Sequence, residues 1–245
     1  MTLVLAPRAD PKQPEVNSEH RVVGIIGGMG PEATVDLMRR VVAKTPAHED
    51  QDHVHLIVES NPKIPSRIAH LIEGTGADPT PELIRIAANL QRAGAQALAI
   101  PCNTAHAYAH SIRRAVSIPL LDMIDLTVKQ IAGSPRIARV GLLASSAVIA
   151  TELYAKAFSG HGIAVVRPGR QDEVMALIRA VKRGDTGLQI QTALGHIALE
   201  LSSQADVLLI GCSELSVIAA GVTVPFVDSL EVQAEAIVKF ATSAA

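Results

Sequence analysis

Short, nearly continuous apolar runs recur along the chain and alternate with longer amphipathic stretches. Between the runs, apolar residues recur at helical spacing, as in 31–44, 81–93 and 147–158. Buried strands separated by helices predict an α/β fold in which helices cover both faces of parallel sheets. The runs with the length of buried strands are 21–27, 54–60, 95–101, 139–145, 162–168 and 205–211.

The pattern of runs and helices occurs twice. The stretch that begins RVVGIIGGMGPEAT aligns with ARVGLLASSAVIAT. GAQALAIPCNTAH aligns with ADVLLIGCSELSV, so that Cys102 matches Cys212, and IPLLDMIDLTVKQIA aligns with VPFVDSLEVQAEAIV, so that Asp122 matches Asp228. Three matches in the same order indicate a duplicated α/β unit.

The duplication predicts two pseudo-symmetric domains that face each other across a cleft holding the active site. We expect the first α/β domain to comprise residues 21–121 plus 227–245, and the second to comprise 122–226. Residues 1–20, which are rich in Pro and charge, are expected to form a loose N-terminal tail.

The composition of the chain disfavours several classes of function. The 245 residues carry a formal net charge of -2 and include two Tyr, three Phe and no Trp, which disfavours a nucleic-acid partner. The apolar run Leu3–Ala6 is too short for a signal sequence, and no later stretch suits a membrane. Two cysteines provide no disulfide framework, so we expect a cytoplasmic protein with reduced thiols.

Cys102 and Cys212 each follow a predicted strand and precede a predicted helix. The carboxyl ends of strands are where open α/β sheets bind ligands, so the two thiols are expected to approach one cleft from opposite sides. Such a pair suits racemisation: one thiolate removes a proton beside a carboxylate, and the other thiol returns one to the opposite face. A helix N-terminus helps to lower the pKa of a thiol.

Polar residues follow both cysteines. Asn103 and Thr104, and Ser213 in the other half, offer side-chain and backbone donors to a carboxylate and to the charge of an enediolate-like state. The alternative is that each cysteine is a small core residue, which is the common fate of a free thiol.

Two other motifs have competing interpretations. Gly28, Gly30 and Ala33 match a dinucleotide-binding fingerprint, but the acidic residue that this fold needs at the end of its second strand is missing at the required distance. The stretch HEDQDHVH (48–55) suggests metal ligands, but no second cluster completes a tetrahedral site, so we expect no metal. For His106 the alternatives are facing the site and packing its helix, and we expect the packing role.

The stretches GIIGGMGPEAT, SNPKIPSR, IPCNTAH and GCSEL resemble the cofactor-independent aspartate/glutamate racemase superfamily, in its aspartate racemase branch. The resemblance runs from about Arg21 to the C-terminus. It implies two pseudo-symmetric α/β domains, a two-cysteine amino-acid racemase that needs no pyridoxal phosphate, and a homodimer. Ser213 stands where the family usually has Thr, and it keeps the hydroxyl.

The resemblance also assigns candidate substrate-binding residues. It implies that Arg67 binds a substrate carboxylate and that Lys182 reaches the distal carboxylate from the second domain. The Gly-rich turn would close around the substrate, with backbone N–H groups near Met29 and Gly30. Two further candidates come from their positions in this sequence. Glu214, beside Cys212, would orient a loop or tune the thiol, and Ser145 or Ser146, which match the Gly-rich turn in the duplicated pattern, would hold the α-amino group.

The leading hypothesis is therefore an aspartate or glutamate racemase that acts through Cys102 and Cys212. Nearby alternatives are hydantoin racemase or maleate isomerase chemistry, with the same thiols but other substrate contacts. A module that binds an amino acid without turning it over, and a dehydrogenase, are hypotheses of different classes.

Overall fold

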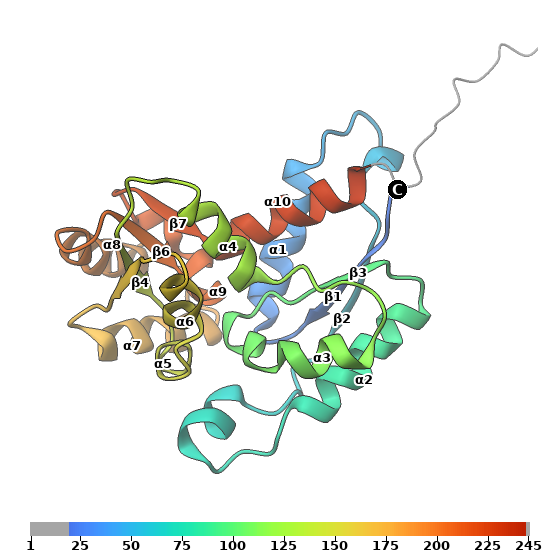
Figure 1. Cartoon of the computed structure of the whole chain (residues 1–245), viewed down its shortest axis with the longest axis horizontal. Helices are drawn as coiled ribbons and strands as arrows, with labels where there is room; N and C mark the ends of the chain where they lie inside the picture. The colour runs from blue at the N-terminus through green and yellow to red at the C-terminus, as the bar shows by residue number, and fades with distance from the viewer. Residues whose placement is uncertain (1–19, 244–245) are drawn as a thin grey trace, which may run out of the picture.

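The structure, a computed structural model, describes residues 20–243 and contains two parallel β-sheets, each surrounded by helices (Figure 1). The predicted N-terminal tail lies, except for its last residue, outside the described residues. The first sheet has the order β2-β1-β3, with β1 Val23–Gly27, β2 Leu56–Ser60 and β3 Ala97–Ala99. The second has the order β5-β4-β6-β7, with β4 Arg139–Leu143, β5 Ala164–Val166, β6 Val207–Ile210 and β7 Phe226–Asp228.

The α/β prediction is confirmed, and six of these strands lie inside the six predicted runs. The seventh, β7, was not predicted because its run is short and begins after Pro225. In the first half, the equivalent run forms only a single parallel bridge between Leu98 and Leu120.

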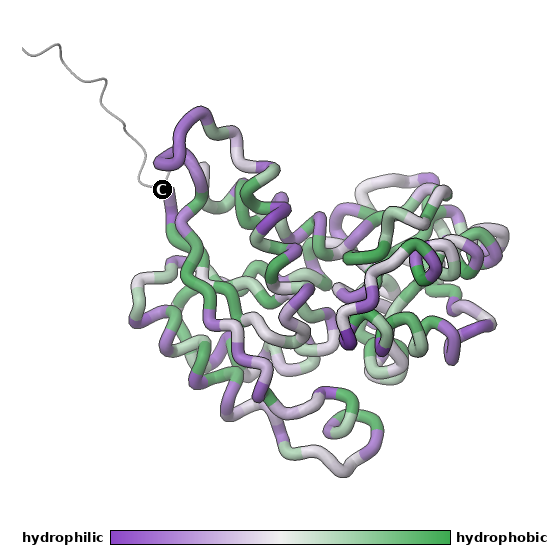
Figure 2. The backbone as a smooth tube through the Cα atoms, turned by 180° about the vertical axis from the view of Figure 1, so that it is seen from behind, coloured by the Kyte–Doolittle hydropathy of each residue, from purple (hydrophilic) through white to green (hydrophobic). Residues whose placement is uncertain are grey.

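The helices surround the two sheets, and Figure 2 shows hydrophobic and hydrophilic residues alternating along them. The α-helices are α1 Pro31–Lys44, α2 Thr80–Arg92, α3 Ala109–Ala115, α4 Met123–Ala132, α5 Ser146–Ala150, α6 Leu153–Ser159, α7 Gln171–Lys182, α8 Leu188–Ser202, α9 Ser213–Val217 and α10 Ser229–Thr242. The shorter helical turns are η1 Asp50–Asp52, η2 Ala69–Glu73, η3 Asn103–Tyr108 and η4 Ala219–Gly221. Within residues 20–243, no helix has the length and apolar character needed to cross a bilayer.

One predicted helix is wrong. Residues 147–158 form two helices, α5 and α6, because Glu152 has a left-handed backbone with φ 57°. The hydroxyl of Thr151 donates to the carbonyl of Ala147 (2.7 Å), which satisfies the end of α5 at the break.

Each sheet is buried on both faces. In the first half, α2 and α3 cover one face and α1 and α10 the other. In the second, α7, α8 and α9 cover one face and α4 and α6 the other. Helix α10 follows the last strand of the second sheet but packs along α1 of the first half, so it connects the two halves (Figure 1).

Candidate active site

The Gly-rich turn after β1 is shaped by close backbone contact. Gly28 has φ +92°, and a Cβ atom there would lie 2.4 Å from the carbonyl carbon of Asn61. The hydroxyl of Thr34 accepts from Gly28 N (2.9 Å) and donates to the carbonyl of Gly30 (3.1 Å). As predicted, α1 begins at Pro31. This turn holds Met29 at the wall of a pocket.

Each cysteine lies just beyond the carboxyl end of a strand, as predicted. Cys102 follows β3 and precedes η3, whereas Cys212 follows β6 and precedes α9. The helices after them are weaker than the sequence indicated: η3 is a 3-10 helix and α9 has 5 residues. The stabilisation of a thiolate by an aligned helix dipole is therefore smaller than expected.

Both thiols line one small pocket between the two halves, with a cavity volume of about 40 Å³. The pocket opens into a wider vestibule bordered by residues 28–33 of the Gly-rich turn. The residues that line the pocket are Met29, Ser66, Arg67, Ile68, Cys102, Thr104, Ser145, Ile178, Lys182, Cys212 and Glu214.

Glu214 connects the second thiol to a cation. The thiol of Cys212 donates to Oε2 of Glu214 (3.2 Å), and Nζ of Lys182 lies 3.3 Å from Oε1. Burial and then the neighbouring carboxylate of Glu214 raise the pKa of the Cys212 thiol well above its usual range. Burial alone would lower the pKa of Lys182, but Glu214 and the two thiols outweigh it and raise that pKa.

Arg67 reaches the pocket from the segment between β2 and α2, which extends from the first half toward α5 of the second (Figure 1). One nitrogen, Nη1, donates to the carbonyl of Pro65 (3.0 Å), whereas the buried Nε has no hydrogen-bond partner among the described residues. The guanidinium therefore keeps a donor for a ligand. Next to it, Ile68 packs against the core of the second half and holds the segment there.

Thr104 and Ser145, one from each half, are in contact at the wall of the pocket. Their hydroxyl oxygens lie 3.3 Å apart. The hydroxyl of Ser145 also accepts from Val148 N (3.3 Å) and caps α5. Both hydroxyls keep hydrogen-bonding capacity toward a ligand in the pocket.

Four of the candidate residues do not line this pocket: Gly30, Asn103, Ser146 and Ser213. Gly30 borders only the vestibule. The buried side-chain amide of Asn103 accepts from the hydroxyl of Tyr154 (2.6 Å) and donates to the hydroxyls of Ser229 (3.1 Å) and Ser213 (3.5 Å). The polar atoms of the Asn103 and Ser213 side chains are thus engaged with each other and with neighbouring hydroxyl groups. These two side chains join the two halves behind the thiols.

Sequence reasoning did not find Ser66, Ile68 or Ile178. Ser66 directly precedes Arg67 on the same Pro-rich segment, and this proximity could have identified Ser66 as a candidate. The two isoleucines carry no chemical signal, because an apolar residue at a pocket wall has the same pattern as one in the core.

The side chain four residues after each cysteine lies close to the carbonyl group of that cysteine. Nδ1 of His106 lies 2.9 Å from the Cys102 carbonyl and donates to it, because Nε2 accepts from Met123 N (3.1 Å). Burial lowers the pKa of His106 and favours this neutral form. In the other half, the hydroxyl of Ser216 lies 3.4 Å from the Cys212 carbonyl and donates to Oδ1 of Asp228 (2.6 Å).

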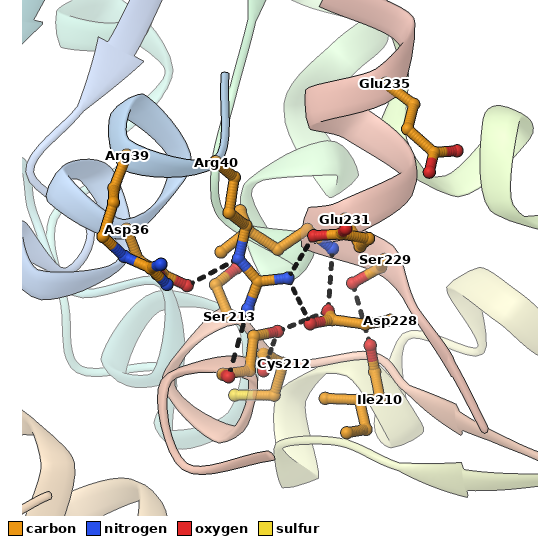
Figure 3. Close-up of polar contacts among 12 residues, drawn as sticks. Asp36, Arg39, Arg40, Ile210, Cys212, Ser213, Asp228, Ser229, Glu231 and Glu235 are labelled. Atoms are coloured by element: carbon orange, nitrogen blue, oxygen red, sulfur yellow. Dashed lines mark hydrogen bonds and ion pairs between the residues drawn. The ribbon is translucent and has the colours of Figure 1, made fainter. Parts of the chain in front are cut away.

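A buried ionic cluster lies behind Cys212 (Figure 3). Arg40 of α1 donates to Oδ2 of Asp228 (2.7 Å), to Glu231 (2.8 Å) and to Oδ2 of Asp36 (2.8 Å). Another nitrogen of Arg40 donates to the Ser216 carbonyl (3.2 Å). The helix that begins at the Gly-rich turn is therefore tied to the segment that carries Cys212.

The competing motifs have structural roles. Residues 48–52 form a capped turn in which Oδ2 of Asp52 accepts from His48 N (2.8 Å) and Glu49 N (2.9 Å). Nowhere in residues 20–243 do three or more His, Cys, Asp or Glu side chains gather as metal ligands. At the end of β2, Glu59 accepts from Arg85 (2.7 Å).

The fold and the pocket define an α/β enzyme whose two halves contribute one thiol each to a single site. The family model of the Asp/Glu/hydantoin racemases matches residues 26–237. The structure of the aspartate racemase of Picrophilus torridus superposes with a TM-score of 0.83 at 32% identity, covering 90% of this chain and 94% of that one.

Proteins related in sequence are also named as amino-acid racemases. The broad-specificity amino-acid racemase RacX of Bacillus subtilis (strain 168) is 28% identical over 215 residues, which are 85% of this chain and 92% of RacX. The glutamate racemase of Mycobacterium avium (strain 104) is 29% identical over 163 residues, and the match spans 56% of its length. The chain belongs to the Asp/Glu/hydantoin racemase family and is an isomerase, an amino-acid racemase.

Proposed function

We propose that the enzyme racemises aspartate or glutamate without pyridoxal phosphate, with Cys102 and Cys212 as its two bases. The observation that carries this proposal is that the chain's two cysteines, from equivalent positions in the two halves, line one pocket. One sulfur removes the α-proton as a thiolate, and the other, as a thiol, protonates the opposite face of the α-carbon.

The groups around the thiols support the binding of an amino acid. Arg67 binds a carboxylate, for which the free donors of a guanidinium are well suited. The backbone of the Met29–Gly30 turn and the N–H groups after each cysteine stabilise the charge that develops on the enediolate-like state. Thr104 and Ser145 accept from the α-ammonium group.

Lys182 decides between acidic and neutral substrates. If its ammonium group reaches the distal carboxylate, the pocket selects aspartate or glutamate. A second candidate is a racemase that also accepts amino acids without a charged side chain, and the broad specificity stated in the name of RacX is in line with it. The distance of 3.3 Å between Lys182 and Glu214 favours this candidate, because it leaves Arg67 as the pocket cation that faces no acidic side chain of the pocket.

We further propose a cytoplasmic homodimer, in which reduced thiols remain available. Helix α1 exposes Val35 (61%), Met38 (37%) and Val42 (53%) on one face, and such a stripe suits contact with a second copy. Light scattering after chromatography tests this assembly: a V35S/V42S variant should elute as a monomer where the parent protein elutes as a dimer.

Exchange of the α-proton with solvent tests the function. NMR in D2O, without added pyridoxal phosphate, would follow both enantiomers of aspartate, glutamate and alanine. Exchange of the acidic amino acids alone supports the first candidate, and exchange of alanine supports the second. No exchange with any amino acid of a wider panel would contradict a racemase that uses these thiols.

A further inference from the structure

The two halves differ at one position beside their thiols. In the alignment of the two halves, Thr104 is equivalent to Glu214, since each lies two residues after its cysteine. Glu214 is 7% exposed and accepts a hydrogen bond from the Cys212 thiol, whereas Thr104 bonds to Ser145. The two sulfurs are otherwise similarly buried, since the cysteines are 7% and 5% exposed.

We propose that Glu214 keeps Cys212 protonated in the resting enzyme, so that Cys102 is the base of the free enzyme. A carboxylate that accepts from S–H stabilises the thiol and repels a thiolate at the same place. The other charged groups at this pocket are Lys182 from α7 and Arg67 from the segment after β2, and both favour a thiolate. Of these, Lys182 is paired with Glu214, so its effect on Cys212 is partly cancelled.

The proposal defines a proton cycle, and it rests on the proposed racemisation. The thiolate of Cys102 takes the α-proton, and the electron pair of the broken C–H bond stays on the substrate as an enediolate-like state. That pair then forms a new C–H bond with the proton of Cys212. The enzyme is left with a Cys102 thiol and a Cys212 thiolate, and proton exchange with solvent restores the resting form.

This asymmetry has a kinetic consequence. Enantiomers are equally stable, so kcat/KM must be equal in the two directions. One enantiomer needs the Cys212 thiolate and therefore binds only the minor form of the enzyme. Its apparent affinity is its affinity for that form multiplied by the fraction of the enzyme present in that form. Its KM and its kcat should therefore both exceed those of the other enantiomer by the same factor, and Glu214→Gln should reduce that factor.

Alkylation by iodoacetamide tests the proposal without any substrate. With only two cysteines in the chain, Cys102→Ala reports on Cys212 alone and Cys212→Ala on Cys102 alone. The midpoint pH of alkylation should be higher for Cys212 than for Cys102. Glu214→Gln, added to Cys102→Ala, should lower it by at least one pH unit, which is at least a tenfold faster reaction near pH 7.5.

Two further variants separate electrostatics from disruption. Lys182→Met should raise the Cys212 midpoint, opposite to Glu214→Gln, whereas loosened packing would move both in one direction. Glu173→Gln, on the exposed start of α7 beside Arg170, is the matched control and should change nothing. The proposal is overturned if Cys212 titrates at or below Cys102, or if Glu214→Gln leaves the midpoint in place. Either result leaves the exchange test of the proposed function unaffected.

Discussion

Nη1 of Arg40 lies 2.7 Å from Oδ2 of Asp228, and the two residues join α1 to the N-terminus of α10 (Figure 3). Oδ1 of Asp228 accepts from Ser216, whose hydroxyl also lies 3.4 Å from the carbonyl of Cys212. The ion pair therefore supports the segment that positions the second thiol.

Replacing Arg40 by Met should destabilise the fold strongly. Asp228 would remain buried without its cation, and breaking a buried ion pair in this way costs about 3–5 kcal/mol. Urea denaturation measures the loss. Arg39→Met is the matched control: the Arg39 side chain is 70% exposed, and its pair with Asp36 should contribute less than about 1 kcal/mol. Equal losses in the two variants would contradict the role of the buried cluster.

Replacing Gly28 by Ala should damage both stability and activity. The new Cβ would lie 2.4 Å from the Asn61 backbone, which would push the turn that carries Met29 away from the pocket. Gly94 is a suitable comparison, because its φ is also positive (+102°) but nothing lies within 4 Å of a Cβ atom there. Thermal unfolding should show only the backbone cost of about 1 kcal/mol for Gly94→Ala and a larger loss for Gly28→Ala. Racemisation should fall only in Gly28→Ala.

The buried His106 should make stability depend on pH. Burial lowers its pKa in the folded state, so the unfolded chain takes up a proton first as the pH falls below about 6.5. Stability should then decrease toward acidic pH, by at most about 1.4 kcal/mol per pH unit from this residue. His106→Gln should show a shallower decline in urea denaturation between pH 7 and pH 5. His110→Gln, on the exposed side of α3, should retain the slope of the parent protein.

Arg67 and Lys182 should affect different substrates. Arg67→Met should raise KM for every amino acid, because each has an α-carboxylate. If Lys182 binds the distal carboxylate, Lys182→Met should raise KM for aspartate at least tenfold more than KM for alanine. Steady-state kinetics with both substrates measures this contrast. An equal effect of Lys182→Met on both would show that Lys182 acts on the thiols instead.

Much of the fold and of the pocket could be predicted from the sequence. The buried strands were recognisable because they are short and almost continuously apolar. The duplication placed Cys102 and Cys212 at equivalent strand ends. The Gly-rich turn was visible because only glycine fits the positive φ of Gly28.

Other features depend on contacts between distant segments. Arg40 and Asp228 are 188 residues apart, and no local pattern indicates that they meet. Asn103 looked like a ligand-binding residue, but packing against Tyr154 uses its amide. The break at Glu152, where the backbone is left-handed, leaves no mark on the helical periodicity of residues 147–158. Such features require the folded chain, because they depend on which faces come together.

The most direct test of the central claim uses the single-cysteine variants and both enantiomers of one substrate in D2O. Racemisation should be lost in Cys102→Ala and in Cys212→Ala. Each variant should still exchange the α-proton of only one enantiomer, and the two variants should select opposite enantiomers, because each remaining thiol faces one side of the α-carbon. Racemisation that survives in either variant, or exchange of the same enantiomer by both, would contradict a mechanism with two opposed thiols.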